Sequence, residues 1–100
     1  MYQCISVVYA RPEGRDAILE AGKRLVSLSR SEPGNIYYNL LQSSDDANIL
    51  ILIEKWESRE AFLGHVANAG TSGDPVYEFG QVAQDNSAKP PEIFNCDVVV

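Results

Sequence analysis

The sequence predicts an α+β domain with the ferredoxin-like element order β-α-β-β-α-(α)-β, in which a four-stranded antiparallel sheet carries its helices on one face. Three observations support this fold. β-branched and aromatic residues gather in four short segments, apolar residues recur at helical spacing between them, and turn-forming residues separate the segments. With 100 residues, of which 45% are hydrophobic, the chain is expected to form a single domain over residues 1–100.

The first half of the chain contains three predicted strands and one helix. Residues 2–9 are rich in β-branched and aromatic types, and they stop before residues 11–14, which signal a turn and a helix start. A helix is expected over about residues 15–31, because apolar side chains recur there at three- and four-residue spacing: Ala17, Ile18, Ala21, Leu25 and Leu28. Residues 35–42 and 49–56 are the second and third strands, and the short polar segment between them predicts a hairpin.

The second half contains one or two helices and a last strand. Ser58 is a good N-cap, and Ala61, Phe62, His65 and Val66 are expected to fall on one side of the helix after it. Residues 70–73 should end this helix. A short third helix is expected after Asp74-Pro75, with an apolar side formed by Val76, Phe79, Gly80 and Ala83. Residues 92–100 are expected to form the last strand beside the first, as in ferredoxin-like sheets.

The third predicted strand is apolar on both faces. Ile49, Ile51 and Ile53 alternate with Leu50 and Leu52, whereas a strand with one solvated face usually alternates apolar and polar residues. Because the helices cover only one face of the predicted sheet, a monomer would expose a large apolar patch. The sequence therefore predicts a homodimer in which two open sheet faces pack together.

Charge and hydropathy exclude several classes of partner. The net charge of -6 indicates neither a nucleic-acid partner nor an anionic membrane, since both need clustered Lys and Arg. The longest apolar run, residues 49–53, is far shorter than the roughly 20 residues that cross a bilayer. The first residues lack the pattern of a secretion signal, so a cytoplasmic protein is expected. Cys4 and Cys96 lack metal-ligand spacing and are expected to stay reduced, although they fall on neighbouring predicted strands.

A set of spaced motifs in the middle of the chain points to a known family. Glu32-Pro33-Gly34 is followed by Tyr38, then by Glu-Lys-Trp-Glu-Ser at residues 54–58, then by His65. This pattern resembles the antibiotic biosynthesis monooxygenase family. The resemblance implies a dimeric α+β barrel, in which two sheets pack face to face and each protomer holds an apolar pocket between sheet and helices. Members include cofactor-free oxygenases of quinols and anthrones, haem-degrading relatives, and an isomerase of a phosphorylated signalling sugar.

Two residues are candidates for acid–base catalysis. His65 is the only histidine, and it is expected on the helix face that meets the sheet, where an imidazole could serve as base. The alternative is a histidine hydrogen-bonded within the core. Glu54 is expected on the same strand face as Trp56 and could accept a proton. The alternative for Glu54 is a half-exposed carboxylate paired with a Lys or Arg.

Aromatic and amide side chains nearby are candidates for substrate binding. Trp56 and Phe62 could form aromatic walls, although Trp56 could equally anchor the strand–helix corner by packing. Tyr37 and Tyr38 point to opposite faces of their strand, so one should face the pocket and the other the partner subunit, with Asn39 on the side of Tyr37. Phenol and amide groups of this kind can orient a hydroxyl group or stabilise a substrate anion.

The sequence gives no support for a cofactor. Haem-degrading relatives use a histidine after the second helix, and residues 67–77 contain none. No Gly-rich phosphate motif, metal cluster or Ser-His-Asp arrangement is visible. The expected function is therefore a cofactor-independent monooxygenase that acts on a small aromatic, quinol-like or enolisable substrate. The alternatives are a non-catalytic ligand-binding or regulatory dimer, and a cofactor-free isomerase or decarboxylase.

Overall fold

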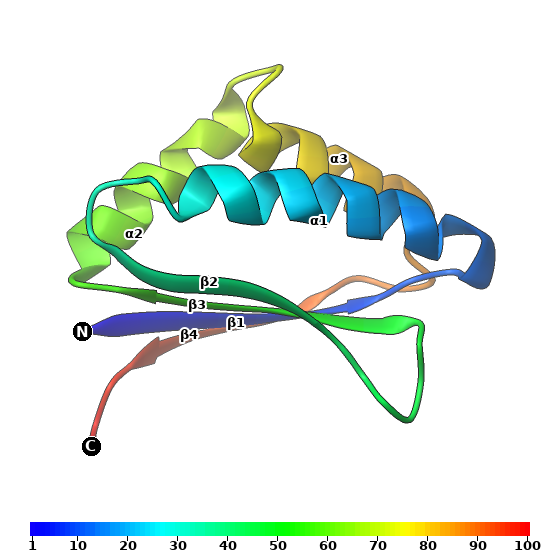
Figure 1. Ribbon diagram of the computed structural model, residues 1–100, viewed down its shortest axis with the longest axis horizontal. Helices are drawn as coiled ribbons and strands as arrows, with labels where there is room; N and C mark the ends of the chain where they lie inside the picture. The colour runs from blue at the N-terminus through cyan, green and yellow to red at the C-terminus, as the bar shows by residue number, and fades with distance from the viewer.

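The computed structural model describes residues 1–100 and has the predicted α+β ferredoxin-like fold (Figure 1). The strands are β1 (Tyr2–Tyr9), β2 (Asn35–Gln42), β3 (Ile49–Trp56) and β4 (Glu92–Asp97). The α-helices are α1 (Arg15–Ser29), α2 (Arg59–Val66) and α3 (Pro75–Asn86), and the 3-10 helices are η1 (Pro12–Gly14) and η2 (Ala67–Gly70). The strands form one antiparallel sheet in the order β2-β3-β1-β4, so β4 lies beside β1 as expected.

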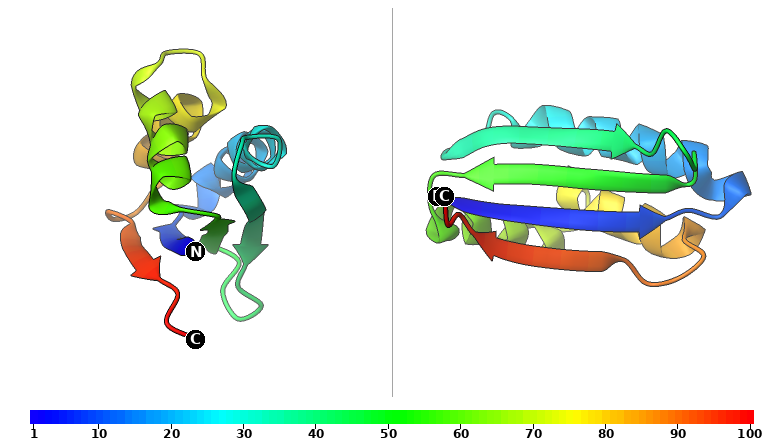
Figure 2. Two further views of the ribbon diagram at one scale, coloured as in Figure 1. Left: turned by 90° about the vertical axis from the view of Figure 1, so that its left-hand side faces the viewer. Right: turned by 90° about the horizontal axis from the view of Figure 1, so that it is seen from below.

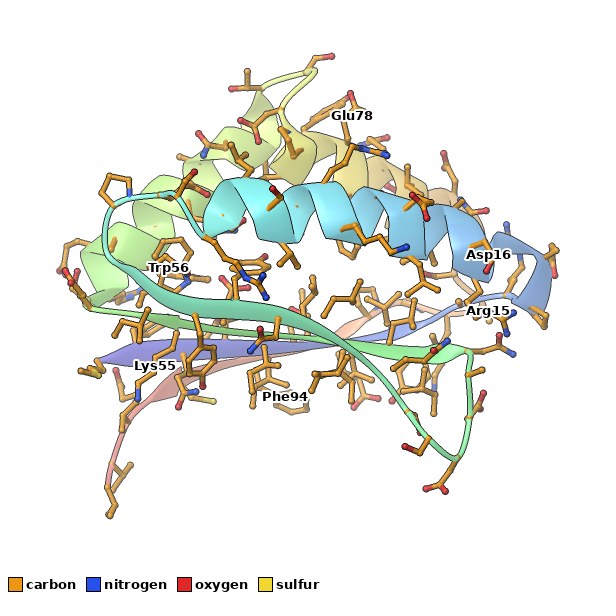
Figure 3. The ribbon with its side chains drawn as sticks, viewed as in Figure 1. Arg15, Asp16, Lys55, Trp56, Glu78 and Phe94 are labelled. Carbon is orange, nitrogen blue, oxygen red and sulfur yellow. The ribbon has the colours of Figure 1, made fainter.

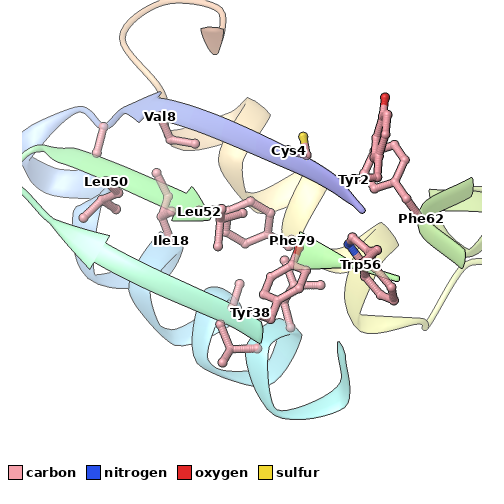
Figure 4. Close-up of a cluster of buried hydrophobic side chains, with 14 residues drawn as sticks. Tyr2, Cys4, Val8, Ile18, Tyr38, Leu50, Leu52, Trp56, Phe62 and Phe79 are labelled. Atoms are coloured by element: carbon pink, nitrogen blue, oxygen red, sulfur yellow. The ribbon is translucent and has the colours of Figure 1, made fainter. Parts of the chain in front are cut away.

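All the helices lie on one face of the sheet, and the other face is open (Figure 2). The core fills the space between the two layers (Figure 4). It contains buried side chains from every strand except β4, together with residues of α1, α2 and α3. None of the helices is long and apolar enough to span a membrane.

Side chains of β3 alternate between these two environments. Leu50, Leu52, Glu54 and Trp56 point toward the helices and are buried, whereas the isoleucines between them lie on the open face and are only partly covered. In Figure 3, Trp56 lies between the sheet and the helices, and Lys55 and Phe94 lie on the opposite side of the sheet. The prediction that this strand is apolar on both faces is confirmed.

Local capping fixes the starts of the second and third α-helices. The Ser58 hydroxyl group accepts a hydrogen bond from the Ala61 amide at 3.1 Å, and the Asp74 carboxylate accepts one from the Val76 amide at 2.8 Å. The helix α3 predicted after Asp74-Pro75 is thus confirmed. Helix α1 ends at Ser29, two residues before the predicted end. Among the apolar residues that predicted this helix, Ala17 is exposed.

The turn between α1 and β2 depends on Gly34. Its φ of +81° lies in the left-handed region, and an added Cβ atom would come within 2.7 Å of the Ala61 Cβ atom on α2. The Gly34 carbonyl oxygen accepts a hydrogen bond from the Glu57 amide at 2.8 Å. The turn that carries Glu32 is therefore held against the corner between β3 and α2.

The last strand is shorter than predicted. β4 ends at Asp97, which pairs with Tyr2, the first residue of β1. The Val98 amide still donates a hydrogen bond to the Met1 carbonyl oxygen at 3.4 Å, but the side chains of Val99 and Val100 are exposed. The predicted continuation of the strand through Val100 was wrong.

Register keeps the two cysteines apart. Cys4 pairs with Asn95, and Cys96 pairs with Gln3, so the two thiols lie on opposite faces of adjacent strands, and both are free. Burial raises the pKa of the Cys4 thiol to about 11, which disfavours the reactive thiolate. We expect thiol titration of the denatured chain to give two thiols per chain before and after reductant. A missing pair in the untreated protein would contradict this.

Candidate active site

A mostly apolar cavity of about 710 Å³ lies between the helix-facing side of the sheet and α3. All four strands, α1, α3 and the segment between α3 and β4 contribute to its lining. The lining residues are Ser6, Val8, Leu25, Tyr38, Leu52, Glu54, Val76, Phe79, Gly80, Ala83, Gln84, Ser87, Lys89, Pro90, Pro91 and Ile93. Glu54 is the only acidic residue among them.

Glu54 presents a buried carboxylate to this cavity. It lies in register with Cys4 on β1 and Tyr38 on β2, and its side chain is only 5% exposed. The Trp56 Nε1–H group donates to Glu54 Oε1 at 3.0 Å. The alternative of a half-exposed carboxylate paired with a Lys or Arg is wrong, because the side chain is buried and the only basic side chain within 4.0 Å of it is that of His65.

Burial raises the pKa of Glu54 above that of an ordinary glutamate. The hydrogen bond from Trp56 and the nearby His65 ring act in the opposite direction, and Glu32 adds to the increase. A carboxyl group of raised pKa is a stronger base when ionised, so Glu54 has the properties of a general base in an apolar cavity.

Tyr38 supplies a protonated phenol next to this carboxylate. Its side chain is buried, and burial together with the charge of Glu54 raises its pKa far above the ordinary value. The Tyr38 hydroxyl group lies 3.4 Å from His65 Nε2. A phenol that keeps its proton can donate a hydrogen bond to a developing oxyanion. Of Tyr37 and Tyr38, Tyr38 is the one on the cavity side.

His65 lies behind the cavity lining. The ring packs against those of Trp56 and Tyr38, with centroid distances of 4.9 and 5.3 Å. His65 Nδ1 lies 2.7 Å from Glu32 Oε1, and Asn68 Nδ2 donates to Glu32 Oε2 at 3.1 Å. The inward orientation predicted for His65 is confirmed, but its contact with the cavity runs through Tyr38 and Glu54.

The other predicted substrate-binding residues lie away from the cavity. Trp56 is fully buried behind Glu54, and Phe62 packs on Tyr2 with a centroid distance of 5.0 Å (Figure 4). Tyr37 and Asn39 lie on the open-face side of the sheet. There the Tyr37 hydroxyl group accepts a hydrogen bond from Gln3, and Asn39 Oδ1 accepts one from Arg30 at 2.9 Å. The structure thus joins Glu54, Trp56, Tyr38 and His65, and it separates Phe62, Tyr37 and Asn39 from them.

Several residues of the site were not singled out from the sequence. Helical spacing did group Val76, Phe79, Gly80 and Ala83 on one side of α3, and all four line the cavity, but nothing indicated that this side bounds a binding site. Glu32 was noted only as part of a motif. No group of three or more His, Cys, Asp or Glu side chains is arranged to hold a metal ion.

Comparisons with known proteins assign the chain to a family. The sequence model described as antibiotic biosynthesis monooxygenase matches residues 1–71. YcnE of Bacillus subtilis is 32% identical over 66 residues, which cover 66% of this chain and 70% of YcnE. The uncharacterised protein sll1783 of Synechocystis is 27% identical over 86 residues, which cover 86% of this chain and 55% of that protein.

Solved structures share the fold over nearly the whole chain. One from Nitrosomonas europaea has a TM-score of 0.87 at 24% identity and covers 100% of both chains. Rv0793 from Mycobacterium tuberculosis has a TM-score of 0.85 at 21% identity, over 99% of this chain and 95% of its own. The family match over most of the chain, together with the identity to YcnE, shows that this protein belongs to the antibiotic biosynthesis monooxygenase family.

Proposed function

We propose that the protein is a cofactor-independent monooxygenase that oxidises a small aromatic, quinol-like or enolisable substrate bound in the apolar cavity. The observation that carries the proposal is the buried carboxylate of Glu54 in the wall of this cavity, with its raised pKa and the Tyr38 phenol beside it. The cavity volume of about 710 Å³ lies within the range typical of small-molecule sites. Family membership supports oxygen chemistry as the reaction class.

The proposed reaction needs only the substrate and dioxygen. Glu54 removes a proton from an acidic C–H or O–H group, and the Tyr38 hydroxyl group stabilises the resulting anion. The electron-rich anion reduces dioxygen and forms a carbon–oxygen bond, which gives a peroxide that takes back one proton. Glu54 then removes the remaining proton on that carbon as the O–O bond breaks. A methylene group and dioxygen thus become a ketone and water, and a quinol becomes a hydroxyquinone and water.

Oxygen uptake tests the proposal directly. The purified chain, supplied with a panel of anthrones and hydroquinones, is expected to consume oxygen above the autoxidation rate and to release one water per ketone formed. Incorporation of ¹⁸O from labelled dioxygen into the product identifies a monooxygenase. Binding of panel compounds without any oxygen uptake would refute the proposed monooxygenase function. Turnover without oxygen would favour an isomerase or decarboxylase.

His65 is proposed to assist Glu54 rather than to contact the substrate, because Tyr38 and Glu54 separate it from the cavity. We expect His65→Ala to lower turnover by roughly 10- to 100-fold, the range typical of residues that act through another group. Turnover and thermal melting should be measured on one preparation. A lower melting temperature with an unchanged rate at saturating substrate would show that His65 is only structural.

The active form is proposed to be a homodimer joined through the open sheet face. Ile5, Val7, Ile51 and Ile53 lie on this face at the centre of the sheet. Leu41 and Phe94 extend the apolar surface toward the two edges, with 46% and 50% of each residue exposed. A continuous apolar surface of this kind favours association with a second copy. Tyr37 and Asn39 would then lie near the partner subunit.

A further inference from the structure

A second carboxylate lies on the far side of His65 from the cavity. His65 Nε2 is 4.0 Å from Glu54 Oε1, and His65 Nδ1 is 2.7 Å from Glu32 Oε1. The His65 side chain is 4% exposed, and that of Glu32 is 17% exposed. The imidazole ring is therefore held between the carboxylate that lines the cavity and one that does not.

The contact with Glu32 decides which ring nitrogen carries the proton. An ionised carboxylate only accepts hydrogen bonds, so the 2.7 Å contact requires a hydrogen atom on Nδ1. In the neutral ring Nε2 then keeps its lone pair. Nε2 lies 3.4 Å from the Tyr38 hydroxyl group and 4.0 Å from Glu54 Oε1, and Tyr38 is the residue of β2 in register with Glu54. The lone pair of His65 Nε2 can therefore accept a proton from Glu54.

The fold holds Glu32 firmly in this position. Asn68 Nδ2 donates to Glu32 Oε2 at 3.1 Å, which orients the carboxylate. Two residues further along, Gly34 lies so close to the helix that carries His65 that an added Cβ atom would come within 2.7 Å of Ala61 Cβ, and the Glu57 amide donates a hydrogen bond to the Gly34 carbonyl oxygen. The backbone turn and the helix are therefore held in one fixed arrangement.

We propose that Glu32 positions His65 in the Nδ1–H tautomer, so that Nε2 takes the substrate proton from Glu54 and stores it until the peroxide needs it. This inference rests on the proposed oxygenase function. The proton passes from the substrate to the Glu54 carboxylate and then to Nε2, directly or through the Tyr38 hydroxyl group. The imidazolium that forms lies between two carboxylates, which stabilise it. Glu54 is ionised again for the second proton removal, and the stored proton returns to the peroxide or the leaving hydroxide.

The single histidine makes the tautomer directly measurable. A chain labelled with ¹⁵N-histidine gives one pair of ring-nitrogen resonances, which report the protonated and the unprotonated nitrogen. In spectra that report the neutral ring, the unmodified protein is expected to show a protonated Nδ1 and an unprotonated Nε2. In Glu32→Gln the side-chain amide can donate to Nδ1, so the proton should move to Nε2.

The same variant is expected to lose turnover. Glu32→Gln should lower kcat by roughly 10- to 100-fold and leave KM nearly unchanged, because Glu32 does not line the cavity. Glu60→Gln is the matched control. It removes an exposed carboxylate in the first turn of the same helix and should change neither the tautomer nor kcat.

The two measurements separate failure of this inference from failure of the oxygenase function. A proton on Nε2 in the unmodified protein, or an unchanged tautomer in Glu32→Gln, would overturn the positioning role of Glu32. A changed tautomer with an unchanged kcat would overturn proton storage on His65. If the unmodified protein consumes no oxygen with any substrate of the panel, the oxygenase function and the storage step both fail, while the resonances still decide the role of Glu32.

Discussion

Glu54→Gln is expected to lower oxygen-dependent turnover by roughly two to four orders of magnitude, which is typical for loss of a general base. Glutamine keeps the shape of the side chain, and its carbonyl oxygen can still accept the hydrogen bond from Trp56 Nε1. It cannot take up a proton at neutral pH. Substrate affinity, measured anaerobically, should change little. A variant that keeps the full rate at saturating substrate would remove Glu54 from the mechanism.

The raised pKa of Glu54 gives this prediction a pH dependence. Turnover by the unmodified protein should fall as the pH is lowered through that pKa, which lies above that of an ordinary glutamate, because only the ionised carboxylate acts as base. The groups facing Glu54 are Cys4, Tyr38 and His65, with Glu32 behind His65. A pH profile of kcat/KM reports this ionisation in the free enzyme.

Stability should change with pH in the opposite sense. The folded chain binds the Glu54 proton more tightly than the unfolded chain, so the stabilisation from this protonation is present at low pH and is lost as the pH rises through the folded pKa. The melting temperature of Glu54→Gln relative to that of the unmodified protein should therefore increase as the pH rises from below the pKa of an ordinary glutamate to above the raised pKa of Glu54. Glu60→Gln, at an exposed position, should show no such gain.

Ile51→Asp should separate the proposed dimer. Ile51 lies at the centre of the open face, between Val7 on β1 and Leu41 on β2. In the dimer the introduced carboxylate would be buried and unpaired, which would lower the stability of the dimer by several kcal/mol. The second protomer would contribute an equal loss. Sedimentation at micromolar concentration is expected to give a dimer for the unmodified chain and a monomer or aggregate for the variant.

Leu63→Asp is the matched control for this substitution. Leu63 lies on α2, away from the open face, and 48% of the residue is exposed. This variant should remain dimeric. An unmodified chain that sediments as a monomer would refute the dimer, and so would an Ile51→Asp chain that remains a stable dimer.

The fold could be predicted from the sequence because its signals are local. Ser58 and Asp74 cap the two helices that they were expected to cap, and the alternation of strand residues correctly separated Tyr37 from Tyr38. The end of β4 was missed because it depends on where β1 begins, nearly the whole chain away. Strand ends of this kind are set by the partner strand and not by local composition.

The site was predicted less completely, for a related reason. The alternation of side chains along a strand predicted that Glu54 and Trp56 share a face. It could not predict that α3 covers this face and leaves a cavity at Glu54. The contact between Glu32 and His65 joins residues 33 positions apart, through a turn whose geometry depends on Gly34. Tyr37 and Asn39 were assigned to substrate binding on residue type alone, and the structure puts them on the other face of the sheet.

The cavity is lined by two parts of the chain, of which only the first is matched by the family model. Glu32, Tyr38, Glu54, His65 and Asn68 all fall within residues 1–71, the part that the family model matches. The opposite wall comes from α3 and the segment 87–93, beyond that part. The acid–base groups and the surface that meets the rest of the ligand can therefore diverge separately. For the proposed site, we therefore expect relatives with the same reactive centre to differ in the molecules they accept, with the choice of ligand encoded mainly in the last third of the chain.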